Sequence, residues 1–98
     1  MARHRYARRQ IGDWDGPLRF GGALGPYFVY RVDAHVDYDT HADYGSAVVT
    51  ADNTDEHNDQ NVNWEVGVNG SPVKHGHART IRKAKEHALA ALRKELGV

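Results

Sequence analysis

Cations gather around the start of a predicted helix near the C-terminal end of the chain. Thr80 has the hydroxyl side chain of a helix N-cap, and it precedes a run in which Ile81, Ala84, Ala88 and Leu92 recur at helical spacing. The first N–H groups of a helix lack partners within it, and the helix dipole is positive at that end. Basic side chains at this place predict an anion site suited to phosphate. The candidate nucleic-acid-binding residues are Arg79, Thr80, Arg82, Lys83 and Lys85, with Arg3, Arg5, Arg8 and Arg9 of the N-terminal tract as further phosphate contacts.

The same stretch resembles the last third of a double-stranded RNA-binding domain. The glycine turn, helix cap, basic cluster and inner alanines of that family are matched in spacing by Gly76, Thr80, Arg82, Ala84, Lys85 and Ala88. Ala78 and Ile81 stand where the family usually has glycine and lysine, and no N-terminal helix is predicted where the family has one. The resemblance implies a sheet with helices on one face, and it implies that Arg82, Lys83 and Lys85 contact backbone phosphates across a groove. A solvated helix face without a binding role is the alternative interpretation of these charges.

Histidine and aspartate alternate along a predicted strand and the turn after it, at His35, Asp37, Asp39, His41 and Asp43. Imidazole and carboxylate groups are ordinary ligands for zinc, manganese or non-haem iron. Alternate residues of one strand are about 6.5–7 Å apart, so they converge on one ion only if the turn bends the segment. We therefore predict a solvated polar face without a metal ion. The polar loop 52–61 lacks the central glycine and the spaced glutamate of an EF-hand, so we predict no calcium site there.

No constellation of residues in the chain points to catalysis. The sequence has no cysteine, which excludes thiol nucleophiles, disulfides and thiolate metal sites. It contains neither a nucleophile elbow nor a phosphate-cradling glycine loop. We expect a protein that is not an enzyme and has no cofactor.

The formal net charge of zero conceals three segments of different sign. Residues 1–20 carry five arginines against two aspartates, residues 21–70 one arginine against nine acids, and residues 71–98 seven cations against two glutamates. Such a chain can present an acidic and a basic face, or its charges can pair with each other. The second hypothesis is therefore an acidic face of Asp33, Asp37 and Asp43 that binds a basic host protein. The bias toward arginine, alanine and glycine resembles that of high-GC actinobacteria and their phages, which would make this a phage or mobile-element accessory protein.

The spacing of apolar residues predicts the elements that position these groups. Strands are expected at 27–38, 44–51 and 62–68, and Asn69-Gly70 is the preferred pair for a type I′ turn into a fourth strand. This turn predicts Val66 opposite Val73 and Glu65 opposite Lys74. The fold class is α+β, a three- to four-stranded antiparallel sheet with the C-terminal helix packed on one face. The expected core contains Trp64, Val66, Ile81, Ala84, Ala88 and Leu92.

Residues 1–26 are predicted to be a Gly/Arg-rich N-terminal arm, because glycines and prolines interrupt every periodicity there. Residues 27–98 are predicted to form a single β-β-β-β-α domain. If the strand 27–38 lies at a sheet edge it could pair with a second copy, so a homo-oligomeric structural protein is the third hypothesis. No segment is long and apolar enough to span a membrane and no signal-peptide run is present, so we expect a cytoplasmic protein.

Overall fold

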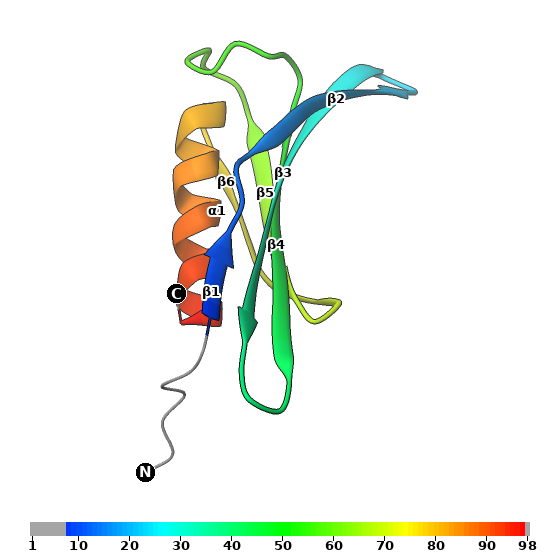
Figure 1. Cartoon of the computed structure of the whole chain (residues 1–98). Helices are drawn as coiled ribbons and strands as arrows, with labels where there is room; N and C mark the ends of the chain where they lie inside the picture. Colours follow the sequence, from blue (N-terminus) through cyan, green and yellow to red (C-terminus); the bar gives the residue numbers. More distant parts are fainter. Residues whose placement is uncertain (1–7, 98) are drawn as a thin grey trace.

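The described part of the chain is a twisted antiparallel sheet with one helix covering one of its faces (Figure 1). The computed structural model describes residues 8–97. Within that range, six strands precede the helix α1 (Ile81–Leu96), and the sheet order is β1-β3-β4-β5-β6, with β2 also paired to β3. The strands are β1 (Arg8–Ile11), β2 (Asp15–Gly22), β3 (Gly25–Asp37), β4 (Ala42–Ala51), β5 (Val62–Val68) and β6 (Ser71–Ala78). The α+β class and the helix on one face are confirmed.

The predicted strand count of three to four is too low, because residues 8–22 contribute two strands. β1 pairs with the end of β3, with Arg8 opposite Asp37, and β2 pairs with its beginning, with Phe20 opposite Tyr27. Both lie on the side of β3 away from β4, so β3 has partners on both sides. These strands owe their conformation to the hydrogen bonds that the edge of β3 offers. Glycines and prolines leave only the short alternation of Leu18 and Phe20 as a strand signal in this segment. The hypothesis of a homo-oligomer paired through strand 27–38 requires this strand to lie at a sheet edge. β3 does not lie at an edge.

The helix follows its sequence signals. Thr80 is the N-cap, with its Oγ1 accepting a hydrogen bond from the Lys83 N–H at 3.1 Å. Gly97 has a left-handed φ of 70° and donates its N–H to the Arg93 carbonyl, which ends the helix as predicted. The buried side of the helix is the predicted one, made up of Ile81, Ala84, Ala88, Ala91, Leu92 and Leu96.

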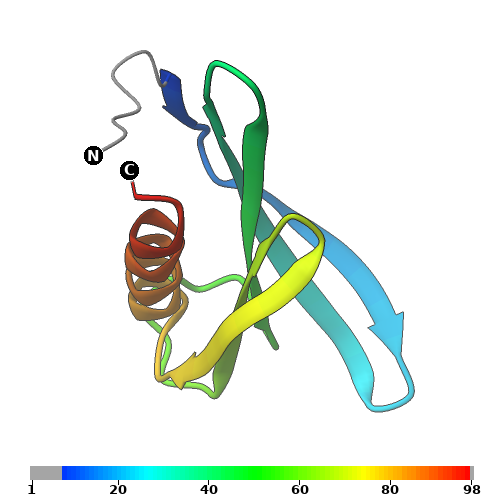
Figure 2. The ribbon, with the colours of Figure 1, turned by 90° about the horizontal axis from the view of Figure 1, so that it is seen from below.

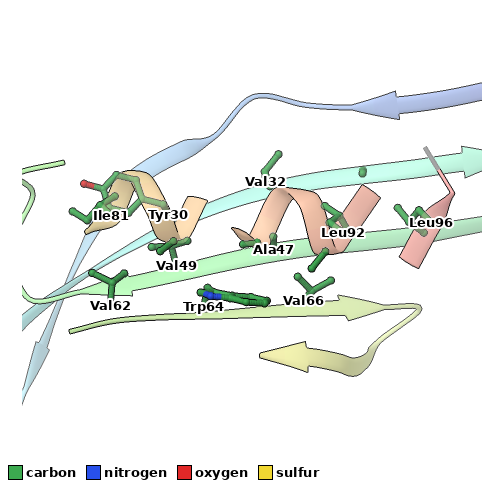
Figure 3. Close-up of a cluster of buried hydrophobic side chains, with 14 of the residues drawn as sticks. Tyr30, Val32, Ala47, Val49, Val62, Trp64, Val66, Ile81, Leu92 and Leu96 are labelled. Atoms are coloured by element: carbon green, nitrogen blue, oxygen red, sulfur yellow. The ribbon is translucent and has the colours of Figure 1, made fainter. Parts of the chain in front are cut away.

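The core lies between the helix and the inner face of β3, β4 and β5 (Figure 3). Alternate residues of these strands are buried, and the predicted core residues of the sheet and of the helix are all buried. Alanines at three of the six buried helix positions let the helix lie close to the sheet. The strands contribute Tyr30, Val32, Ala34, Val36, Ala47, Val49, Ala51, Val62, Trp64 and Val66.

The hairpin of β5 and β6 confirms the predicted turn but not the predicted register. Asn69 and Gly70 have φ values of 52° and 84°, as a type I′ turn requires. A β-bulge follows, so Val66 faces Lys74 and Glu65 faces His75, and the predicted pairs are wrong. The extra residue shifts the register by one, which places Gly76 opposite Trp64. The indole ring of Trp64 therefore lies against the backbone of Gly76, whereas the predicted register would have placed it opposite the side chain of His75.

The hairpin of β2 and β3 extends beyond the rest of the sheet. The pairing of β3 with β4 ends at Phe28 and Ala51, whereas β2 stays paired with β3 to its tip at Gly22 and Gly25. This two-stranded hairpin bends away from the helix, toward the face of the sheet that no helix covers (Figures 1 and 2). In residues 8–97, no helix is both long and apolar enough to cross a membrane.

Candidate functional site

The acidic loop 52–61 lies against the start of the helix, where the sequence predicts an anion site. The Asp59 carboxylate accepts hydrogen bonds from Nε and Nη2 of Arg79, both at 2.7 Å, and this pairing raises the pKa of Arg79. The N–H of Arg82 donates to the carbonyl of Glu56 at 3.2 Å, and the N–H of Gln60 donates to the carbonyl of Arg79 at 2.8 Å. The loop therefore supplies, from within the chain, negative groups of the kind that a phosphate would bring.

Lys85 is held inside this junction. Its Nζ lies 3.2 Å from Oε2 of Glu56 and 4.2 Å from the ring centre of Tyr30, with the ring of Trp14 at 5.7 Å. The Lys85 side chain is only 19% exposed. A lysine stem packed on aromatic rings with its charge paired stabilises the loop, the helix and β3 against each other. Its geometry is that of a structural residue.

The other predicted nucleic-acid residues are spread over the surface. Arg82 and Lys83 face solvent, at 65% and 64% side-chain exposure, and each lies near Glu86, at 3.5 and 3.6 Å. Arg9 donates from Nε to the Gly97 carbonyl at 3.2 Å, so it lies at the opposite end of the helix, about 24 Å from its start at 1.5 Å per residue. Arg8 is exposed on β1, and Arg3 and Arg5 lie outside the described residues. The described members of the set therefore do not form one cluster.

Tyr30→Phe is expected to reduce the loss of stability at alkaline pH. Burial, and then the charge of Glu56, raise the pKa of Tyr30 above its ordinary 10.0. The Tyr30 hydroxyl therefore loses its proton at a lower pH in the unfolded chain than in the folded chain. The stability that the protonated Tyr30 contributes is complete below the unfolded pKa and is lost as the pH rises through the folded pKa. The variant keeps a ring beside Lys85 without a proton to release. Urea denaturation at about pH 8 and about pH 11 should show a smaller decrease in the free energy of unfolding for the variant than for wild type. An equal decrease would contradict this assignment.

The three predicted acidic residues do not share one face. Asp33 and Asp37 lie on the uncovered face of β3, where Asp33 pairs with Arg31 at 2.9 Å and Asp37 lies 3.4 Å from the His35 ring nitrogen. Asp43 is opposite Val36, which places it on the helix side of the sheet, and it accepts from Nδ2 of Asn69 at 3.1 Å. Within residues 8–97, no group of three or more histidines, aspartates and glutamates is placed to hold a metal ion.

The most exposed apolar surface lies on the β2–β3 hairpin, outside the candidate site residues predicted from the sequence. Leu18, Phe20, Leu24 and Tyr27 are four of the six large apolar residues that are exposed in the described chain. The rings of Phe20 and Tyr27 stack with centroids 5.4 Å apart, and Leu18 lies opposite Val29 on the same, uncovered side. The alternation of Leu18 and Phe20 around Arg19 is the strand signal that could have revealed this surface.

The same uncovered face carries a broad hollow of about 1100 Å³ at its other end. It is bounded by β1, by the second half of β3 and by the β5–β6 turn, and Tyr44 and Glu65 stand in its lining. Tyr44 is exposed and its ring lies 6.0 Å from that of His35. Gly12, Gly67 and Gly70 also line the hollow, and their missing side chains leave the space open.

The described residues thus offer two candidate binding surfaces. One is the basic helix surface, formed by the exposed side chains of Arg82 and Lys83, and the other is the uncovered face of the sheet with the apolar β2–β3 hairpin. Comparison of the chain with protein-family models, with curated proteins and with solved structures finds no match in any of the three.

Proposed function

We propose that this chain is a non-enzymatic protein-binding module that contacts its partner through the β2–β3 hairpin. The observation that carries the proposal is the concentration of exposed apolar side chains on that hairpin, at Leu18, Phe20, Leu24 and Tyr27. A soluble domain seldom exposes several large apolar side chains side by side unless they form a contact surface. The stacked rings of Phe20 and Tyr27 supply contact area with little side-chain entropy to lose.

The base of the hairpin supports the same proposal. β3 runs without interruption from the hairpin into the middle of the sheet, where Tyr30 and Val32 are buried beneath the helix. Tyr27 lies on β3 itself, and Leu18 and Phe20 lie on β2, which is hydrogen-bonded to β3, so the strands that carry these side chains are already ordered before a partner binds. We propose the hairpin as the contact surface instead of the predicted acidic face of Asp33, Asp37 and Asp43. Those three residues do not form one face, because Asp43 lies on the other side of the sheet from Asp33 and Asp37.

Photo-crosslinking in cells of the native host tests this proposal. p-Benzoyl-phenylalanine is introduced in place of Phe20, and separately in place of Val73 on β6, which has the same 43% exposure. We expect a discrete protein adduct from position 20 and none from position 73, because equal exposure gives equal random collision. Equal adducts from both positions, or none from position 20, would contradict the proposal.

A second candidate function is nucleic-acid binding, which the outward-facing side chains of Arg82 and Lys83 favour. Arg82→Glu/Lys83→Glu is then expected to abolish binding to short duplexes, and wild-type affinity should fall steeply with salt. Lys85 is left unchanged, because its contacts with Glu56 and Tyr30 make its loss a folding defect. The measurement is fluorescence anisotropy with RNA and DNA duplexes at two salt concentrations. Lys74→Glu, on the exposed strand β6, is the matched charge-reversal control. Unchanged duplex binding by the double variant, or no wild-type binding at low salt, would exclude this function for the helix surface.

A further inference from the structure

We propose that the partner protein adds an extended strand to the outer edge of β2, along residues 18–22, and that this strand carries an acidic side chain beside Arg19. This inference rests on the proposed function, because it names the kind of segment that the hairpin contacts. Strand addition is a common mode of peptide recognition, in which main-chain hydrogen bonds give affinity and alternate side chains give specificity.

The outer edge of β2 is available for such pairing. Residues 18–22 pair with β3 in unbroken register on one side, and all of them are exposed. Among residues 8–97, no strand pairs with β2 on its other side, and no turn or loop backbone is hydrogen-bonded to it there. The main-chain groups on that side can therefore bond an added strand.

The pairing of Gly21 with Pro26 determines which main-chain groups point outward. Opposite residues of an antiparallel pair alternate between those that exchange N–H···O=C bonds and those whose N–H and C=O groups point away from each other. Pro26 has no N–H, so Gly21 and Pro26 are a pair of the second kind. By the same alternation, Arg19 and Phe28 are too. The outer edge thus presents an N–H and a C=O from each of Arg19 and Gly21.

The edge of the sheet at β6 is protected in a way that the β2 edge is not. β6 carries Pro72, which cannot donate a ladder hydrogen bond, and Lys74, whose charge opposes pairing with another strand. Val73 between them is the extra residue of the bulge, which bends this edge. Residues 18–22 contain no proline and no lysine, and Arg19 is their only charged residue. β2 is therefore the edge that favours strand addition.

The side chains of β2 indicate the chemistry of the added strand. Leu18 and Phe20 lie on the uncovered side of the sheet, where Phe20 stacks on Tyr27, so partner residues beside them are expected to be apolar. Arg19 is opposite Phe28 and so lies on the other side, where it has no ion-pair or hydrogen-bond partner within residues 8–97. An acidic partner residue beside Arg19 supplies one. We therefore expect a segment in which apolar and acidic side chains alternate.

A second copy of β2 fits this edge less well than a different protein does. Residues 18–22 contain no acidic side chain, so a second β2 offers Arg19 no opposite charge. Antiparallel pairing of two such strands also brings both arginines to the same side of the sheet, where like charges repel.

Gly21→Pro and Gly21→Ala, each combined with the photo-crosslinker at position 20, test the inference. Proline removes the outward N–H of Gly21, which the pairing with β3 does not use, whereas alanine keeps it. A Cβ at Gly21 meets no heavy atom within 4 Å, and circular dichroism melts establish that both variants fold. We expect Gly21→Ala to keep the wild-type yield of the protein adduct and Gly21→Pro to lower it roughly tenfold, through loss of one main-chain hydrogen bond.

The captured segment provides a second measurement. Mass spectrometry of the adduct gives its sequence, and a synthetic peptide of that sequence is added to the purified protein. Amide hydrogen exchange at Arg19 and Gly21 should slow by about tenfold or more when the peptide is bound, because their N–H groups then have partners. Exchange at Leu18 and Phe20 should change little, since their N–H groups already bond β3.

Charge reversal tests the acidic residue of the partner with the same peptide. Arg19→Glu should weaken binding roughly fivefold in fluorescence anisotropy. Lys74→Glu, the same reversal on β6, should leave the affinity unchanged.

Equal adduct yields from Gly21→Pro and Gly21→Ala, or unchanged exchange at Arg19 and Gly21, would overturn strand addition. A captured segment that belongs to this chain would overturn it as well. The proposed function is decided separately, because a protein adduct that persists in both Gly21 variants still supports binding by the hairpin, whereas the absence of any adduct in wild type contradicts both proposals.

Discussion

Leu92→Ala is expected to lower the free energy of unfolding by about 2–5 kcal/mol, the range for deleting a buried leucine side chain beyond Cβ. Leu92 has no exposed surface, and its Cδ1 lies over the backbone of Gly45, so near that a Cβ at Gly45 would be 2.7 Å from it. The helix and β4 are held apart by the side chains around them, so the cavity cannot close fully. A small domain has about 5–15 kcal/mol of stability in all, so this single change removes a large part of it.

Leu24→Ala is the matched control, since it makes the same chemical change where Leu24 is 105% exposed at the hairpin tip. Its free energy of unfolding should stay within about 0.5 kcal/mol of wild type. Urea denaturation followed by circular dichroism measures both variants. Similar losses for the two leucines would show that the helix does not pack on the sheet as described.

Gly76→Ala is expected to destabilise the protein by about 1–3 kcal/mol, the range for overpacking a filled core. A Cβ at this position would lie 2.5 Å from Cζ2 of Trp64, closer than any carbon contact permits. Trp64 is only 7% exposed and belongs to the buried core between the sheet and the helix, so a shift of its ring disturbs its buried neighbours. Either β6 or the ring must shift, and both movements disturb the packing beneath the helix.

Gly21→Ala controls for the general effect of placing alanine at a strand glycine. No heavy atom lies within 4 Å of a Cβ at Gly21, and its φ is outside the left-handed region. Its stability should change by no more than about 0.5 kcal/mol. If Gly76→Ala melted as this control does, Trp64 would not lie on the backbone of β6, and the bulge that brings Gly76 opposite the ring would lose its explanation.

The sequence was sufficient wherever the decisive contacts are local. Thr80 caps a helix through an amide three residues away, and Gly97 ends it with a conformation that glycine adopts readily. Asn69-Gly70 adopts the left-handed pair of φ values that its turn requires. The buried side of the helix follows from the spacing of Ile81, Ala84, Ala88 and Leu92, because 3.6 residues per turn place them on one side whatever lies opposite.

Tertiary structure decided everything that depends on a distant partner. The strands in residues 8–22 exist because the edge of β3 offers them hydrogen bonds, and the bulge after Val66 depends on which residue can lie beneath Trp64. The sequence shows the cluster of positive charge at the start of the helix, but only the folded chain places Glu56 and Asp59 against Lys85 and Arg79. Charge and periodicity along a chain determine which elements form and which side each one buries. The surface that remains available for binding depends on which distant segments neutralise or cover those elements. The residues next to a charged or apolar side chain in the sequence do not determine which distant segment it will contact.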